Sequence, residues 1–187
     1  QCDRRQRQMC IRDRLRSVGI DNVSILDGGF KEWEQNDLPT SQTSLDYSPS
    51  DFEFTPRENI FVNKDEVINA IGNPDFIILN SLTADIHEGQ NPRYGRRGKI
   101  PSSKNIPFHE LLDNKTGKFK PIEELANMFE KNKITKDKQI LNYCGGGIAA
   151  SLEAFVLYQL GFEKIVIYDN SLHEWAAIDQ TLPMENN

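Results

Sequence analysis

The sequence predicts an α/β fold in three layers, with a central, mainly parallel sheet flanked by helices. Apolar strand-like runs alternate with helical patterns from residue 65 onward, as in sheets covered on both faces. One strand-like run ends at a cysteine that is followed by three glycines. Ligands bind such sheets at the carboxyl ends of the strands, so we expect functional residues at that cysteine.

The individual elements follow from local patterns in chain order. A helical pattern over residues 65–71 is closed by Gly72, and the apolar run 76–79 predicts a strand. Residues 122–130 form an amphipathic pattern that predicts a helix. The chain is then expected to form a strand, a helix and a strand, at 139–143, 149–160 and 164–168.

Two segments of the chain repeat each other. Residues 15–33 (LRSVGIDNVSILDGGFKEW) align without gaps with residues 157–175 (LYQLGFEKIVIYDNSLHEW), at an offset of 142 residues, or 161 minus 19. Each segment predicts a helix closed by a glycine, an apolar strand, and a turn into a short helix with a tryptophan. A period this long indicates a duplicated domain rather than a solenoid.

The repeat divides the chain into four parts. Residues 1–14 have no apolar period and little to bury, so we expect a non-native or disordered segment, with a native basic tail as the alternative. Residues 15–40 are interpreted as the C-terminal remnant of a first domain, too short for a core of its own. Residues 41–58, rich in Ser, Thr, Asp and Pro, are the predicted linker. Residues 59–187 are expected to form a complete domain that carries the cysteine loop.

Composition limits the location and the partners. Cys2, Cys10 and Cys144 lack the spacing of paired disulfides or of a zinc site, which fits a reducing compartment. No run approaches the roughly 18 apolar residues of a membrane span, so we expect a cytoplasmic protein without membrane contact. Residues 1–16 carry a net charge of +4, which leaves −10 for the rest of a chain whose total is −6. This acidic body argues against nucleic-acid binding.

Cys144 lies between a predicted strand and a predicted helix, with three glycines after it. Glycines permit positive φ, so successive backbone N–H groups can form an anion-binding nest, to which the helix N-terminus adds positive charge. Both effects favour the thiolate, the nucleophile of sulfur chemistry. A structural cysteine beside a tight turn is the alternative. A phosphate loop would need Lys and Ser or Thr near Ile148, and a phosphatase or arsenate reductase would need Arg where Ala150 stands.

Several motifs occur together in a fixed order. They are LDGGFKEW in the first unit, RGKIPSSKNIPF at 97–108, NYCGGGIAAS at 142–151 and YDNSLHEW after the last strand. This set resembles the two-domain rhodanese family, the thiosulfate and 3-mercaptopyruvate sulfurtransferases, with CGGGIAA as the active-site loop. The resemblance covers nearly everything from Leu15 onward and implies a rhodanese-like domain in a chain truncated at its N-terminus.

The resemblance also implies a mechanism. The Cys144 thiolate would take sulfane sulfur from a small anionic donor, thiosulfate or 3-mercaptopyruvate, as a persulfide, and cyanide, a small thiol or a protein thiol would remove it. No metal or organic cofactor is implied. The backbone N–H groups implied to hold the outer sulfur belong to Gly145, Gly146, Gly147, Ile148 and Ala149. A non-catalytic or carrier module that binds a protein partner or relays sulfur is the alternative.

The chain departs from the family pattern where the donor binds. Asn80 and Leu82 stand where the family commonly has Asp and Arg, so one donor-holding arginine is missing. A nearby basic loop is expected to bind the donor's anionic end through Arg93, Arg96 and Arg97, unless that loop is ordinary solvated surface. The cysteine loop lacks both the basic residues of thiosulfate-specific members and the serine of mercaptopyruvate-specific ones. The choice of donor therefore stays open, with a slight preference for mercaptopyruvate.

Overall fold

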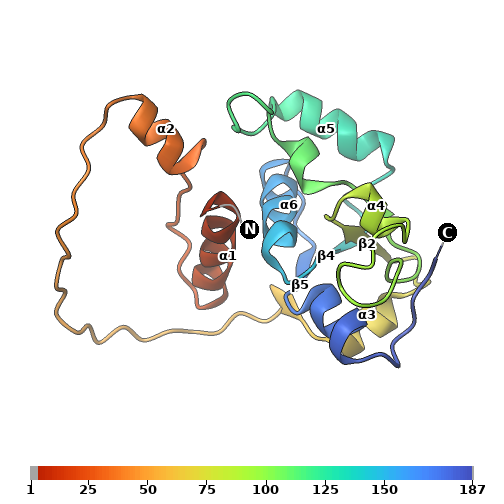
Figure 1. Ribbon diagram of the computed structural model, residues 1–187. Helices are drawn as coiled ribbons and strands as arrows, with labels where there is room; N and C mark the ends of the chain where they lie inside the picture. The colour runs from red at the N-terminus through yellow and green to blue at the C-terminus, as the bar shows by residue number, and fades with distance from the viewer. Residues whose placement is uncertain (1–3, 187) are drawn as a thin grey trace.

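A five-stranded parallel sheet forms the centre of the computed structural model, which describes residues 4–186 (Figure 1). The strands lie in the order β1-β5-β4-β2-β3, and every neighbouring pair is parallel. In chain order they are β1 (Phe61–Val62), β2 (Phe76–Asn80), β3 (Lys104–Asn105), β4 (Gln139–Tyr143) and β5 (Ile165–Tyr168). The predicted α/β class with a mainly parallel sheet is confirmed. Cys2 lies outside the described residues.

Within residues 4–186, two helices precede the first strand, and further helices and helical turns connect the strands and flank the sheet. They are α1 (Arg4–Ser17), α2 (Gly29–Gln35), α3 (Lys64–Ala70), α4 (Ala84–His87), the 3₁₀ turn η1 (Phe108–Leu111), α5 (Ile122–Lys131), α6 (Ile148–Gln159) and the π-helical turn η2 (His173–Ile178). A capping box starts α3: the Asn63 side chain accepts from the N–H of Glu66, whose carboxylate accepts from the N–H of Asn63. Left-handed Gly72, with φ of +71°, follows the end of this helix.

The core has two parts, one on each face of the sheet. Because successive strand residues point to opposite faces, Ile78 and Leu141 join one cluster while Ile77, Leu79 and Ile140 join the other. The helix α6 contributes side chains to both clusters. The strand β4, which precedes the cysteine loop, lies between β2 and β5 and is therefore held on both sides.

The two repeated segments differ in one element and share several contacts. Residues 20–26 form no strand, although the matching residues include β5; β5 is hydrogen-bonded to β4 and β1, whereas 20–26 has no strand beside it. The helix ends agree, because the N–H of Ile20 donates to Leu15 as that of Phe162 donates to Leu157. The tryptophans agree too: the indole Nε1 donates at 2.9 Å from Trp33 to the Pro39 carbonyl and at 2.8 Å from Trp175 to the Pro183 carbonyl.

The helix α1 packs against α6, and Figure 1 shows the two side by side. The sequence predicts little burial for residues 1–14, yet Met9 and Cys10 are 0% and 5% exposed. Arg12 pairs with Asp13, and its guanidinium also lies 5.0 Å from the ring centre of Phe155. The weak helical periodicity concealed this burial, because the buried face of α1 includes a charged pair as well as apolar residues.

The segment 38–57 has no helix or strand and is exposed, and in Figure 1 it runs as a wide loop away from the sheet. Its end is fixed by Arg57, which makes two hydrogen bonds of 2.6 and 2.7 Å to the carboxylate of Asp21. Within residues 4–186, no helix combines the length and the apolar character needed to cross a bilayer.

Candidate active site

Cys144 directly follows β4 at the carboxyl edge of the sheet and is 2% exposed. The loop that follows needs its glycines. Gly147 has φ of +78°, and a Cβ there would lie 2.6 Å from the carbonyl oxygen of Asp169. A Cβ on Gly145 would collide with the phenol ring of Tyr94, whereas one on Gly146 would meet nothing within 4 Å. The tight fit at two of the three glycines fixes the path from Cys144 into α6.

Ser171, which the sequence analysis did not single out, anchors this loop. Its hydroxyl accepts from the N–H groups of Cys144 at 3.0 Å and Gly147 at 3.2 Å, and donates to the carbonyl of Tyr168 at 2.6 Å. The N–H of His173 also donates to the carbonyl of Gly145, at 2.8 Å. The segment after β5 therefore holds the cysteine loop in position.

This contact corrects one expectation about the nest. The N–H of Gly147 was expected to face the sulfur anion, but it is used by Ser171. The loop N–H groups left for a sulfur anion are those of Gly145, Gly146, Ile148 and Ala149. Two of these belong to the first turn of α6, where N–H groups lack helical acceptors.

A pocket of about 270 Å³ includes Cys144 in its wall. Three stretches of chain meet there: the cysteine loop, the residues after β2, and the loop before β3 with the residue that opens η1. The lining residues are Cys144, Gly145, Gly146, Ile148, Ala149, Leu82, Thr83, Ile86, Arg93, Tyr94 and Phe108. The pocket thus combines the predicted nucleophile with most of the predicted loop.

Only one of the three predicted donor-binding arginines lines this pocket. It is Arg93, whose guanidinium lies 5.8 Å from the centre of the Tyr94 ring. Arg97 instead donates to the carbonyls of Gly89 and Gln90, at 2.9 and 2.8 Å. The side chain of Arg96 is also occupied elsewhere.

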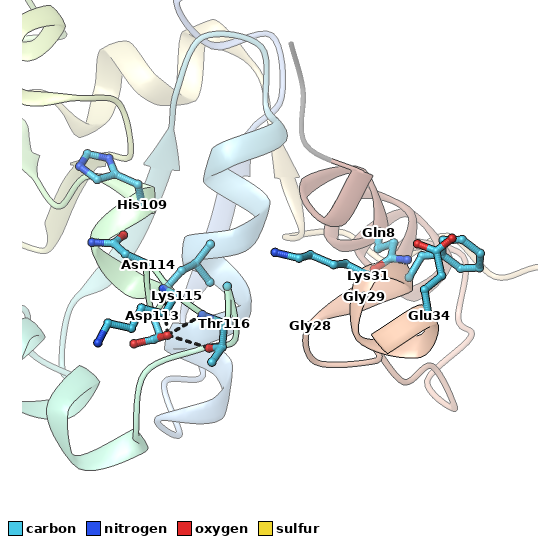
Figure 2. Close-up of a pocket in the computed structure, with 13 residues that line it drawn as sticks. Gln8, Gly28, Gly29, Lys31, Glu34, His109, Asp113, Asn114, Lys115 and Thr116 are labelled. Atoms are coloured by element: carbon cyan, nitrogen blue, oxygen red, sulfur yellow. Dashed lines mark hydrogen bonds between the residues drawn. The ribbon is translucent and has the colours of Figure 1, made fainter. Parts of the chain in front are cut away.

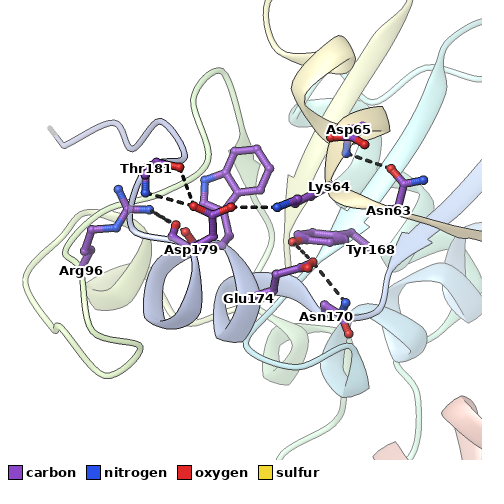
Figure 3. A network of polar contacts seen from close by, with 10 residues as sticks. Asn63, Lys64, Asp65, Arg96, Tyr168, Asn170, Glu174, Asp179 and Thr181 are labelled. Atoms are coloured by element: carbon purple, nitrogen blue, oxygen red, sulfur yellow. Dashed lines mark hydrogen bonds and ion pairs between the residues drawn. The ribbon is translucent and has the colours of Figure 1, made fainter.

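Arg96 binds the C-terminal segment of the domain, and Figure 3 shows it directed toward Asp179. Its guanidinium donates to carbonyl oxygens of four residues on or after η2: Trp175 at 2.5 Å, Ala176 at 3.4 Å, Asp179 at 3.2 Å and Leu182 at 2.7 Å. Lys64 approaches the carboxylate of Asp179 from α3, at 2.8 Å, and lowers the pKa of that carboxyl to about 2. The role of Arg96 in this structure is therefore to hold η2 and the residues that follow it, up to Leu182.

A neutral polar network lies beside the pocket. Asn80 donates to Nδ1 of His87 at 3.1 Å and accepts from the N–H of Leu82 at 3.0 Å. Burial and the nearby Lys99 lower the pKa of His87 to about 4, so its ring is neutral and can accept that bond. These bonds place Leu82 in the pocket wall.

A second buried polar pair lies under the same region. Glu153, on α6, is fully buried and is hydrogen-bonded to the hydroxyl of Ser81, the residue before Leu82. Burial raises the pKa of Glu153 to about 8, and the hydrogen bond to Ser81 offsets only part of this effect. The neutral acid is therefore the main form at neutral pH.

Another cavity lies elsewhere. It has about 420 Å³ and is bounded by residues of α1, α2 and the loop around Asp113, as Figure 2 shows. The carboxylate of Asp113 closes its own loop by accepting from the N–H and hydroxyl of Thr116, at 2.7 and 2.8 Å. No cysteine is among the described residues that line this cavity. Across residues 4–186, no three His, Cys, Asp or Glu side chains gather in a way that could hold a metal ion.

Comparisons with known proteins agree with this fold and extend to sequence. The model of the family described as Rhodanese-like domain matches residues 64–178. The 3-mercaptopyruvate sulfurtransferases of Mus musculus and Escherichia coli K12 are each 30% identical to this chain, over 86% and 91% of it and 55% and 61% of their own length. The thiosulfate sulfurtransferase of Gallus gallus is 28% identical, over 86% of this chain and 56% of its own.

A solved structure gives the same fold. An anaerobic ergothioneine biosynthesis enzyme from Chlorobium limicola, in complex with trimethyl histidine, superposes with a TM-score of 0.86 at 18% identity, over 96% of this chain and 45% of that one. This chain thus spans a little over half the length of the curated relatives and under half of the structural one.

Proposed function

Because the chain belongs to the rhodanese-like domain family, we propose that it is a sulfurtransferase with Cys144 as its sulfur carrier. The observation that supports this most is the position of Cys144: at the carboxyl end of β4, in the wall of a pocket, with loop N–H groups beside it. Thiosulfate and 3-mercaptopyruvate are the proposed donors. Cyanide, a small thiol or a protein thiol is the proposed acceptor.

The reaction proceeds in two displacement steps. The Cys144 thiolate attacks the outer sulfur of thiosulfate, the S–S bond breaks, and sulfite leaves with the bonding electron pair. The persulfide anion stays on Cys144, where the N–H groups of Gly145, Gly146, Ile148 and Ala149 stabilise it. Cyanide then attacks the outer sulfur, thiocyanate leaves, and the thiolate is regenerated.

Arg93 is the proposed contact for the donor's anionic end, because it lines the pocket with Cys144 while Arg96 and Arg97 bind backbone carbonyls. When 3-mercaptopyruvate is the donor, its sulfur starts as a thiol, so one further proton transfer is needed. Its C–S bond breaks toward carbon, and the proton of the thiol ends on that carbon.

Intact-mass measurement after donor treatment tests the proposal. We expect one added sulfur on the unsubstituted chain and on Cys10→Ser, and none on Cys144→Ser. Cys10 is a demanding control, because its Sγ lies 3.9 Å from the carbonyl of Gly147 without lining the pocket. An adduct that persists in Cys144→Ser would refute the assignment. An adduct that forms without turnover to thiocyanate would favour the carrier module.

A further inference from the structure

The pocket at Cys144 combines apolar walls with little charge. Apolar side chains from three stretches of chain line it: Leu82 and Ile86, Phe108, and Ile148 with Ala149. Leu82 and Ile86 are each 6% exposed and belong to the core, so these walls are packed in place. Among the described residues that line the pocket, Arg93 is the one charged side chain.

Space for a donor larger than thiosulfate exists next to the nucleophile. Gly146 is exposed, and a Cβ placed on it would meet no atom within 4 Å. The pocket volume of about 270 Å³ likewise exceeds the space that a five-atom anion fills.

Charge and desolvation favour a donor of a particular kind. A small dianion such as thiosulfate loses hydration along the apolar walls, and the single guanidinium of Arg93 offsets only part of that cost. A donor with one negative charge next to its reactive sulfur has half the charge of thiosulfate, so less lost hydration has to be offset. If it also carries an apolar body, that body gains from burial against Leu82 and Phe108.

We propose that this pocket selects sulfane donors with one negative charge and an apolar body, of the aryl thiosulfonate class, over thiosulfate, and that Leu82 is a specificity-determining residue. The inference rests on the proposed sulfurtransferase function. The step is balanced: the Cys144 thiolate attacks the terminal sulfur of the thiosulfonate, the S–S bond breaks, and the aryl sulfinate leaves with the electron pair. The products are the Cys144 persulfide and one sulfinate anion.

Three donors with cyanide as the common acceptor test this on the full chain. Benzenethiosulfonate and methanethiosulfonate share the reacting group and differ in the apolar body, and thiosulfate adds the second charge. Each kcat/KM is divided by the rate of the same donor with free cysteine, which removes intrinsic reactivity. We expect benzenethiosulfonate to exceed each of the others by about tenfold or more. A ratio of one, or thiosulfate as the best donor, would overturn the inference.

Two near-isosteric variants test Leu82. Leu82→Met keeps the wall apolar and should keep the phenyl-to-methyl ratio, whereas Leu82→Gln places an amide there and should lower it about threefold or more. Equal ratios in the two variants would remove Leu82 from the proposal. Should Leu82→Gln fail to fold, the donor comparison on the unsubstituted chain still decides the main point. Failure of all three donors to place sulfur on Cys144 would refute the sulfurtransferase function itself, which is a different outcome from transfer without phenyl preference.

Discussion

Ser171 shows how a single hydroxyl can determine the geometry of the nucleophile. It is fully buried and makes three hydrogen bonds, to the N–H groups of Cys144 and Gly147 and to the carbonyl of Tyr168. In Ser171→Ala all three groups lose this partner, so we expect a loss of about 1–3 kcal/mol in the free energy of unfolding. Alkylation of Cys144 by iodoacetamide should also change in rate, because the loop is no longer held.

Ser151→Ala is the matched control for that substitution. Ser151 is buried beside the same loop, but its hydroxyl donates to a Gly147 carbonyl that already accepts from the N–H of Ser151. We therefore expect a smaller loss of stability and an unchanged alkylation rate. Equal effects in the two variants, measured by urea unfolding and by alkylation, would show that Ser171 has no special role.

Glu153 is expected to make stability depend on pH. Its pKa is raised from the ordinary 4.5 to about 8, so between these values the folded chain holds a proton that the unfolded chain has released. The stabilising contribution of the neutral acid is complete below about pH 4.5 and is lost as the pH rises to 8, by up to about 1.4 kcal/mol per pH unit. Urea unfolding from pH 5 to 8 should thus show the unsubstituted chain losing stability relative to Glu153→Gln.

The comparison with Glu153→Gln isolates this one group. Asp13 and His87 also have shifted pKa values, raised to about 6 and lowered to about 4, and they titrate in both proteins. Their contributions cancel in the difference between the two unfolding free energies. A difference that stays constant from pH 5 to 8 would mean that Glu153 is ionised in the folded state.

Residues differ in how far the sequence alone could identify them. Cys144 was predictable because a strand, a cysteine, three glycines and a helix are adjacent in the chain. Ser171 was not, because its hydroxyl reaches a loop 27 residues away and its neighbours give no periodic signal. The arginines illustrate the same limit: Arg93, Arg96 and Arg97 lie within five residues, yet only Arg93 lines the pocket.

Elements were predictable where local patterns determine them. The predicted strand at 139–143 is β4 itself, and the predicted helices at 65–71 and 122–130 correspond to α3 and α5 within about one residue. The short elements β1, β3 and η1 were missed because two to four residues carry no readable period. The strand predicted within 20–26 did not form, because a strand needs a neighbour and an apolar pattern does not supply one.

Arg96 is one of the residues that hold the turn η2 to the domain, and this leads to an element-scale prediction. Because the guanidinium of Arg96 serves carbonyls of Trp175, Ala176, Asp179 and Leu182, Arg96→Ala should cost roughly 1–3 kcal/mol in urea unfolding. Arg96→Lys should recover only part of that loss. Its ammonium group donates from a single nitrogen, whereas the guanidinium donates from a planar group of nitrogens.

Arg93→Ala provides the contrast. It should leave the free energy of unfolding within about 0.5 kcal/mol, because Arg93 is exposed, and should lower kcat/KM for anionic donors about tenfold or more. Lys131→Ala, an exposed change in α5, controls for the loss of one positive charge. The assignment of the two roles fails if Arg96→Ala lowers kcat/KM at unchanged stability while Arg93→Ala does not.

At the scale of the whole molecule, the five strands and the pocket are formed by residues that follow the first sixty. All five strands and the entire pocket lie between Phe61 and η2. Of the described residues before β1, Met9 is buried within one of the two core clusters, and Ile25 packs against the edge of that cluster. The exposed stretch 38–57 connects the two parts. At its end, Arg57 is hydrogen-bonded to Asp21 and Ser17.

We therefore predict that residues 59–187, produced alone, fold and take up sulfur on Cys144. Their loss of stability relative to the full chain should be only about 2–5 kcal/mol, because removing α1 uncovers the Met9 site and the face of α6 under Arg12. Cooperative urea unfolding followed by circular dichroism measures the first claim, and intact mass after donor treatment measures the second. A fragment without a cooperative transition would mean that α1 is an integral part of the domain. A folded fragment that accepts no sulfur, beside a full chain that does, would mean that the segment before residue 59 holds the cysteine loop in its active geometry through the contact between α1 and α6.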